Sequence, residues 1–224
     1  MNERSVKDSL VPALGFHWLT PYYDAVVRLT TREETFKRAL IQQADVGPNA
    51  RILDLGCGTG TLSVWIKQRH PDALVTAVDG DPAVLEIARR KAATNGVAIS
   101  FDRAYSTALP YRERCFDKVM STLFFHHLAM SEKEMTLAEI YRVLSPGGQL
   151  HVADWGQASG PLMRFLFFGI QILDGYRNTQ DNVSGKLLEA ISMAGFVNVT
   201  ERRTFSTIFG TISLYRAVKP IQGR

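Results

Sequence analysis

Short apolar runs and amphipathic stretches alternate along the chain from Arg51 onward. The apolar runs predict five strands, over Arg51–Leu55, Leu74–Asp79, Ala98–Arg103, Phe116–Thr122 and Gln149–Asp154. Stretches with helical spacing lie between them and predict helices over Thr61–Arg69, Pro82–Asn95 and Glu132–Leu144. Asp81 and Pro82 favour a helix start, and the Pro-Gly-Gly of residues 146–148 favours a helix stop. This alternation is typical of an α/β domain with a mostly parallel sheet.

Two regions lie outside this alternation. The run "YYDAVVRLTTREETFKRALIQQA" has apolar residues at helical spacing, so residues 1–48 are predicted to form an N-terminal helical cap. After the fifth strand comes an apolar stretch, "PLMRFLFFGIQILDGY", and then a helix predicted over Val183–Ala194. Two final strand-like runs, "FVNVTERRTF" and "TISLYRAVK", predict an antiparallel pair. The main domain is therefore expected over residues 49–224.

Composition limits the class of protein. The chain has 224 residues, of which 46% are hydrophobic and 21% charged, so it can bury the core of one ordinary globular domain. The net charge is +4, and the basic residues come as short pairs such as Arg89-Arg90 and Arg202-Arg203. That distribution argues against an extended nucleic-acid-binding surface.

The two cysteines and the N-terminus bear on the compartment. Cys57 and Cys115 stand in unlike contexts, so we expect no disulfide and a reducing environment. The N-terminus lacks the apolar region of a signal peptide, and no run of 18 apolar residues occurs. These features predict a cytoplasmic protein.

The run "ILDLGCGTG", residues 52–60, is the strongest sign of a ligand site. A dinucleotide fingerprint would need a third glycine at Thr61, and a phosphate-binding loop would need a lysine after the glycines. Asp54, two residues before Gly56, disfavours a pyrophosphate and favours an ammonium group. Asp79 ends the next strand, where a carboxylate can accept hydrogen bonds from both ribose hydroxyls. A ligand with a ribose and an ammonium but no phosphate is S-adenosylmethionine.

Five blocks, in this order and spacing, closely resemble the class I S-adenosylmethionine-dependent methyltransferases: "ILDLGCGTG", "AVDGDP", "LPYRERCFDKV", "FFHHL" and "EIYRVLSPGGQLHVADW". The resemblance is nearest to the branch with the ubiquinone/menaquinone-biosynthesis C-methyltransferases. It implies a Rossmann-like fold: a seven-stranded, mostly parallel sheet with helices on both faces and a C-terminal antiparallel hairpin. It also implies a small, hydrophobic methyl acceptor, with C- or O-methylation ahead of N-methylation. "STLFFHH" stands where methyltransferases of nucleic-acid amino groups carry [ND]-P-P-[YFW], so no nucleic-acid partner is expected.

The resemblance implies a cofactor site built on the strand ends. The loop backbone would lie against the methionine part, Asp54 near its ammonium, and Asp79 on the ribose diol. Tyr105 stands where the family commonly has an aspartate that contacts adenine; its ring can stack on adenine, and Asp102 is a substitute for the missing acid. The cofactor-binding residues expected on this basis are Asp54, Gly56, Cys57, Gly58, Gly60, Asp79, Gly80, Tyr105, Ser106 and Ser121.

His126 and His127 follow the fourth strand, at the sheet edge where open α/β folds bind ligands. Either imidazole can take a proton from the acceptor near neutral pH, with His126 the first candidate. The alternative for each is packing or capping. No metal ligand set is expected.

Some interpretations stay open in the sequence. The apolar insert, about residues 157–180, is buried between sheet and lid, or walls the acceptor site, or makes a transient contact with a membrane surface. Tyr22 and Tyr23 cover the cofactor or pack in the core. Tyr105, in place of the family's usual aspartate, would also be expected in a non-catalytic regulatory protein that binds S-adenosylmethionine or a nucleoside. An aminopropyl transferase shares the fold, but its polyamine would need acids that "FFHHL" lacks.

Overall fold

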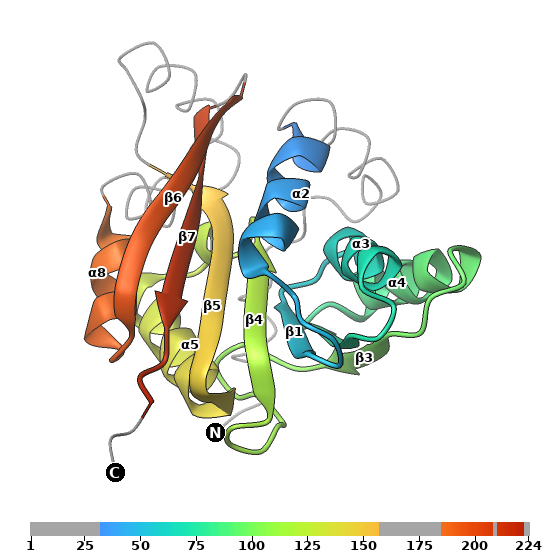
Figure 1. Cartoon of the computed structure of the whole chain (residues 1–224), viewed down its shortest axis with the longest axis horizontal. Helices are drawn as coiled ribbons and strands as arrows, with labels where there is room; N and C mark the ends of the chain where they lie inside the picture. The colour runs from blue at the N-terminus through green and yellow to red at the C-terminus, as the bar shows by residue number, and fades with distance from the viewer. Residues whose placement is uncertain (1–31, 157–184, 208–209, 222–224) are drawn as a thin grey trace, which may run out of the picture.

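The computed structural model describes residues 32–156, 185–207 and 210–221, and it shows a seven-stranded sheet in the order β3-β2-β1-β4-β5-β7-β6 (Figure 1). Strands β1 to β5 run parallel to one another, and β7 lies antiparallel to both β5 and β6. The strands are β1 Arg51–Leu55, β2 Leu74–Asp79, β3 Ser100–Arg103, β4 Phe116–Thr122, β5 Leu144–Trp155, β6 Val197–Thr207 and β7 Gly210–Val218.

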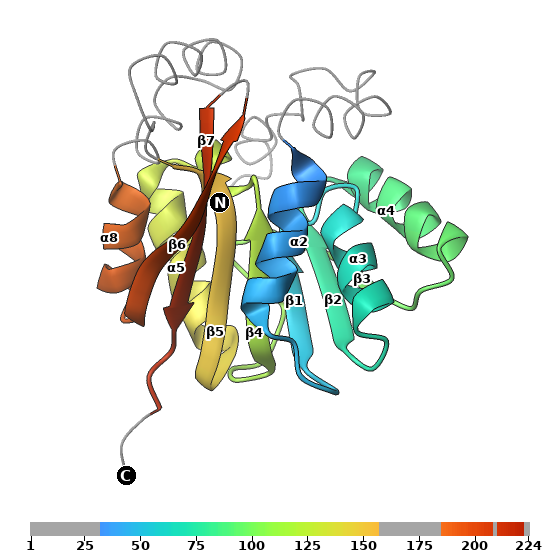
Figure 2. The same ribbon diagram turned by 45° about the horizontal axis from the view of Figure 1, so that its top comes forward.

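Helices cover both faces of the sheet. Helices α2 (Glu33–Ala44), α3 (Thr61–Arg69) and α4 (Pro82–Thr94) lie on one face. Helices α5 (Met130–Val143) and α8 (Lys186–Met193) lie on the other, and a 3₁₀ turn, η4 (Phe125–His127), follows β4. Figure 2 shows the two groups on opposite sides of the strands.

Two hydrophobic cores explain why the strands read as nearly continuous apolar runs. Along β1, Ile52 packs toward α2 and α3, whereas Leu53 packs toward α5. Both side chains are fully buried. In a parallel sheet with helices on each face, side chains on both sides of a strand are shielded from water. The strand sequences therefore do not alternate between polar and apolar residues.

The strand order reverses between β1 and β4, and this places the candidate site. From β1 the chain continues outward to β2 and β3, whereas the sheet continues the other way through β4 and β5. Ligands of open α/β sheets bind at such a switch point, outside the carboxyl ends of the strands. The glycine loop after β1 and the turn η4 after β4 meet there.

The expected fold class is confirmed, and the deviations lie at element ends. Strand β3 begins at Ser100 rather than Ala98, and α5 ends at Val143, before the Pro-Gly-Gly run. That run belongs to β5, which starts at Leu144 rather than Gln149. The backbone there is paired: Gly147 N–H donates to Lys219 O and Lys219 N–H donates to Gly148 O, both at 2.9 Å.

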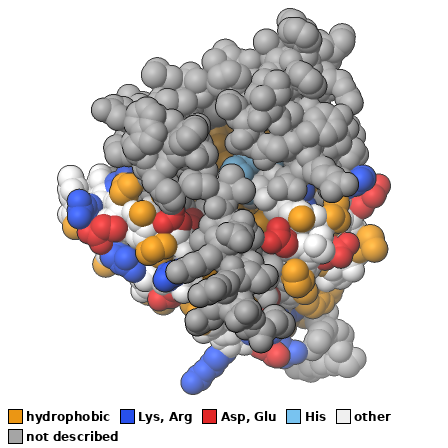
Figure 3. Space-filling view, turned by 180° about the vertical axis from the view of Figure 1, so that it is seen from behind, with side chains coloured by type: hydrophobic (Ala, Val, Ile, Leu, Met, Phe, Trp, Pro, Cys, Tyr) orange, Lys and Arg blue, Asp and Glu red, His pale blue; other side chains and the backbone are white. Residues whose placement is uncertain are grey.

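Several predicted features lie outside the described residues. These are the cap before residue 32, including Tyr22 and Tyr23, the apolar insert at about residues 157–180, and the start of the helix predicted from Val183. Within the described part of the chain, no helix is long and apolar enough to cross a bilayer. On the face seen in Figure 3, acidic, basic and hydrophobic side chains are interspersed over the described surface.

Candidate functional site

The glycine loop is a tight turn fastened to β2. Gly56, Gly58 and Gly60 all have left-handed backbone angles, with φ of 66°, 51° and 75°. The N–H groups of Gly56 and Cys57 donate to Val78 O at 2.9 and 3.0 Å. Burial, helped by nearby carboxylates, raises the pKa of the Cys57 thiol, so it stays protonated at neutral pH. The thiol is therefore a poor nucleophile, and the predicted contact of Cys57 with the cofactor stays a prediction.

The three glycines have different surroundings. A Cβ on Gly56 would lie within 3.0 Å of three atoms of the Phe124 side chain, and a Cβ on Gly60 would lie 2.9 Å from Ala88 Cβ of α4. A Cβ on Gly58 would meet no described atom within 4 Å. Gly56 and Gly60 are thus required for packing, whereas Gly58 borders open space.

The carboxylate of Asp54 is buried, and one of its two oxygens accepts no hydrogen bond from the described residues. Its side chain is fully buried, and Oδ2 accepts a hydrogen bond from Ser63 Oγ at 2.5 Å. Oδ1 has no hydrogen-bond partner among the described residues. Burial raises the pKa of this carboxyl to about 6, even though Ser63 and the charge of Lys37 oppose the shift. A buried acceptor without a donor is rare, and an ammonium group, directly or through water, would satisfy it.

Asp79 joins the loop to the end of β2. Its Oδ2 accepts from Gly58 N–H at 2.9 Å, and its Oδ1 accepts from Asp81 N–H at 3.0 Å. Burial raises the pKa of Asp79 despite these hydrogen bonds. A carboxylate oxygen can accept more than one hydrogen bond, so both oxygens can still receive vicinal hydroxyls. Next to it, Gly80 O accepts from Arg103 Nε at 3.3 Å, which ties β3 to the same corner.

Tyr105 and Asp102, the two residues expected near adenine, differ in exposure and in hydrogen bonding. Tyr105 follows β3 with 40% of its surface exposed, so its ring is available to a ligand. Asp102, the substitute acid, accepts a hydrogen bond from Tyr111 Oη at 3.0 Å. Burial and this bond raise the pKa of Tyr111, which keeps its proton on the phenol. Asp102 therefore already has a donor, whereas the predicted adenine contact of Tyr105 stays a prediction that its exposure permits.

Ser106 and Ser121 bind other parts of the protein. Ser106 Oγ lies 2.8 Å from Thr136 Oγ1 on α5, and Ser121 Oγ donates to Leu55 O at 2.8 Å. The Ser121 bond satisfies the last carbonyl of β1 just before the glycine loop. Each hydroxyl therefore has a partner within the protein, and the predicted cofactor contacts of the two serines stay predictions.

Asp154, at the end of β5, organises the turn after β4. Its Oδ1 accepts from His126 Nδ1 at 2.8 Å and from Trp155 N–H at 2.7 Å. Its Oδ2 accepts from the N–H groups of Phe124 and His126 at 3.1 and 3.3 Å. Burial acts to raise the pKa of Asp154, but His126 and the hydrogen bonds outweigh it, and the pKa is lowered. The carboxylate stays ionised and fixes one ring nitrogen of His126.

His127 differs from its neighbour. The two rings are 3.9 Å apart between centroids. Burial, together with the charge of His126, lowers the pKa of His127 to about 3, so it is neutral and weakly basic. Among the described contacts the Asp154 carboxylate bonds the His126 ring, so the structure distinguishes two histidines that the sequence left nearly equal.

Sequence reasoning missed Asp154, Ser63 and Phe124. Asp154 stands at the carboxyl end of a strand, as Asp54 and Asp79 do for their part of the sheet, so its position alone could have indicated a role. Ser63 and Phe124 gave no comparable signal, because their roles depend on contacts with β1 and its loop.

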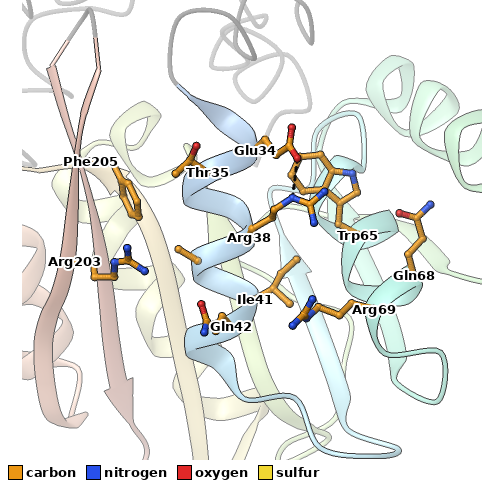
Figure 4. Close-up of a pocket in the computed structure, with 11 residues that line it drawn as sticks. Glu34, Thr35, Arg38, Ile41, Gln42, Trp65, Gln68, Arg69, Arg203 and Phe205 are labelled. Atoms are coloured by element: carbon orange, nitrogen blue, oxygen red, sulfur yellow. Dashed lines mark hydrogen bonds and ion pairs between the residues drawn. The ribbon is translucent and has the colours of Figure 1, made fainter.

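A separate groove of about 770 Å³ lies on the outer side of α2. It is lined by residues of α2, α3 and β6, with Trp65 on one side of the helix and Phe205 on the other (Figure 4). None of the residues expected to bind cofactor or to act as a base lines it.

The comparisons with known proteins point to methyltransferases. A family model described as a methyltransferase domain matches residues 52–148. A demethylmenaquinone methyltransferase of Thermus thermophilus is 39% identical over 142 residues, which is 62% of this chain and 64% of that protein. A ubiquinone/menaquinone biosynthesis C-methyltransferase of Ectopseudomonas mendocina is 29% identical over 228 residues, which is 92% of this chain and 87% of that protein. The chain spans less than two thirds of the Thermus relative and of those from Deinococcus radiodurans and Symbiobacterium thermophilum.

Solved structures show the same fold. The S-adenosylmethionine-dependent methyltransferase SibL aligns with a TM-score of 0.74 at 21% identity, over 94% of this chain and 60% of that chain. Phosphoethanolamine N-methyltransferase 2 of Haemonchus contortus, solved in complex with S-adenosyl-L-methionine, aligns with a TM-score of 0.65 at 16% identity, over 83% of this chain and 52% of that chain.

Proposed function

Residues 52–148 match the methyltransferase-domain family. From that premise we propose that the chain transfers the methyl group of S-adenosylmethionine to a ring carbon of a small, hydrophobic hydroquinone. The observation that carries the proposal is the buried His126–Asp154 pair, which stands at the strand ends beside Asp54 and the glycine loop. A carboxylate behind an imidazole is the arrangement of a general base, and this favours an enzyme over a non-catalytic binding protein.

The donor fits the residues at the ends of β1 and β2. Asp54 Oδ1 offers a buried acceptor for the ammonium, Asp79 offers two oxygens for the ribose, and the exposed ring of Tyr105 can cover the adenine. Gly58 leaves the space that the donor needs. When bound, the donor supplies a methyl group on a positively charged sulfur, which is already a good electrophile.

The acceptor, rather than the donor, is what the protein must activate. A phenol is a poor carbon nucleophile until its hydroxyl loses a proton, which places negative charge on the oxygen and on ring carbons. His126 can take that proton, because Asp154 holds its other nitrogen and stabilises the resulting imidazolium. After the new C–C bond forms, the ring carbon releases its own proton to solvent and aromaticity returns. The names of the quinone-methylating relatives support this acceptor class.

Donor binding is the first test of the proposal. Calorimetric titration should give micromolar binding of S-adenosylmethionine and S-adenosylhomocysteine, and none of NAD, because Thr61 stands where the dinucleotide fingerprint needs its last glycine. Binding of NAD alone would contradict the donor assignment.

With the donor established, incubation with a reduced 1,4-naphthoquinol tests the acceptor, and methylated product is expected by mass spectrometry.

Alanine at Gly58 and at Gly60 should separate donor binding from packing. Both substitutions put an alanine in the left-handed region and should each cost about 1–2 kcal/mol of stability. Gly60→Ala also overlaps Ala88 and should lose a further 1–3 kcal/mol or so. A side chain at Gly58 meets no described atom within 4 Å but would take up space proposed for the donor, so Gly58→Ala should lower donor affinity by about tenfold or more. Urea unfolding and calorimetry check the pair, and an equal loss of donor affinity in both variants would contradict this division of roles.

A further inference from the structure

The backbone before η4 is strained at a residue that is not glycine. Leu123 has a φ of 52°, in the left-handed region. For a bulky side chain this conformation costs about 1–3 kcal/mol, and such strain concentrates at functional sites. Leu123 N–H donates to Ala153 O at 2.8 Å, so the neighbouring strand holds the conformation in place. The bend redirects the chain at the carboxyl end of β4.

The residue that follows this bend is fixed on both sides. Phe124 N–H donates to Asp154 Oδ2 at 3.1 Å, and Phe124 O accepts from His127 N–H at 3.1 Å. Its ring meets Phe125 edge-on, with the centroids 5.8 Å apart and the planes at 73°. Phe125 is fully buried, whereas Phe124 remains partly exposed. The Phe124 ring is therefore held in one place at the boundary of the core.

The Phe124 ring lies against the α-carbon of Gly56, the first glycine of the loop. A side chain on Gly56 would strike the Phe124 ring, so the ring lies directly against the loop. In the chain, Phe124 comes two residues before His126, and Gly56 comes two residues after Asp54. The ring therefore borders the loop that follows Asp54, and it belongs to the segment that leads into the turn with His126. In the proposed donor site the methionine part lies against this loop, which would bring the sulfonium next to the ring.

We propose that Phe124 presents its ring to the donor's sulfonium and so makes the site prefer the charged donor over the neutral product. The proposal rests on the proposed function, because it assumes S-adenosylmethionine in this site. An aromatic ring attracts a cation within about 6 Å of its centre. S-adenosylhomocysteine carries an uncharged thioether, so it would gain none of this attraction. Such a site binds S-adenosylmethionine more tightly than S-adenosylhomocysteine, which favours release of the product.

The ratio of two affinities tests the proposal. Phe124→Leu removes the ring while keeping an apolar side chain, and calorimetry measures the dissociation constants of S-adenosylmethionine and S-adenosylhomocysteine. The donor should bind about 2- to 30-fold more weakly, and the product should change by less than about twofold. An equal loss for both ligands would show that Phe124 only packs the loop and would overturn the proposal, as would no change for either.

A second measurement keeps the test valid if Phe124→Leu does not fold. Fluorinated phenylalanines incorporated at position 124 alone preserve the shape of the ring and weaken its attraction for cations. The donor-to-product affinity ratio should fall stepwise with fluorine number, and a constant ratio would reject the cation contact. Phe125→Leu is the matched control: it removes the adjacent buried ring and should lower stability without changing the ratio. Wild-type protein that binds neither ligand would instead refute the proposed function itself.

Discussion

Asp54→Asn should stabilise the unliganded protein at pH 8 and at the same time abolish tight donor binding. The pKa of Asp54 is about 6 in the fold against an ordinary 3.8, because burial opposes its charge. At 1.36 kcal/mol for each unit of pKa, keeping the carboxylate ionised costs the fold up to about 3 kcal/mol. Asparagine has nearly the same shape, can still accept from Ser63, and carries no charge.

The sign of the effect depends on pH. The folded protein binds the Asp54 proton more tightly than the unfolded chain, so the destabilisation is fully present above about pH 6 and disappears toward pH 4. The gain from Asp54→Asn should follow the same course. Asp117→Asn is the matched control, since Arg51 lowers the pKa of that partly exposed carboxylate. It should lose up to about 1 kcal/mol at pH 8 rather than gain.

Donor affinity should change in the opposite direction. A hydrogen bond between charged groups contributes about 1.5–3 kcal/mol, so losing it should weaken S-adenosylmethionine binding by about 10- to 150-fold. Urea unfolding at pH 8 and pH 5, with calorimetry at pH 8, measures both effects. If Asp54→Asn were no more stable than the wild type at pH 8 and bound the donor equally well, Asp54 would be a structural residue.

His126→Gln should lower kcat by about 10²- to 10⁴-fold while leaving donor affinity nearly unchanged. The reason is that the imidazole is the candidate general base and lies outside the donor contacts. His127→Gln is the matched neighbour, and it should have a much smaller effect on kcat, because its pKa of about 3 makes it a poor base. Methyl transfer to a naphthoquinol, followed by mass spectrometry, measures both variants.

Asp154 should act through His126 rather than by touching the acceptor. Asp154→Asn leaves a side chain of the same size but removes the charge that stabilises the imidazolium, so kcat should fall and its pH dependence should shift. A merely structural role would lower stability without moving the pH profile of kcat. An unchanged profile in Asp154→Asn would show that the pair is not used as a base.

The sequence allowed the fold to be predicted because each helix and strand has local signals. Asp81 is an example: its side chain accepts from Ala83 N–H at 2.8 Å, as expected for a residue that starts a helix before Pro82. The start of β5 was not predictable in this way, since Pro146 and the glycines read as a turn. Their strand conformation depends on β4 and on the hydrogen bonds with Lys219 from the far end of the chain.

The candidate site was predictable to a similar degree. The sequence places three of the predicted residues near the carboxyl ends of strands: Asp54, Asp79 and His126. Because the carboxyl ends of parallel strands lie at the same edge of a sheet, the order of the strands along the chain was enough to predict one site. Their partners were not predictable, because Ser63 and Asp154 reach them only through packing between distant segments. The difference between His126 and His127 likewise depends on which ring meets the buried carboxylate.

The central claim is carbon methylation of a hydroquinone, and one measurement tests it most directly. Wild-type protein is incubated with S-adenosylmethionine bearing a deuterated methyl group and a reduced 1,4-naphthoquinol, and the product is analysed by deuterium NMR and mass spectrometry. The account predicts one labelled methyl group on a ring carbon, formed by wild type and lost in His126→Gln. Label only on oxygen, or no transfer by a protein that binds the donor, would contradict it.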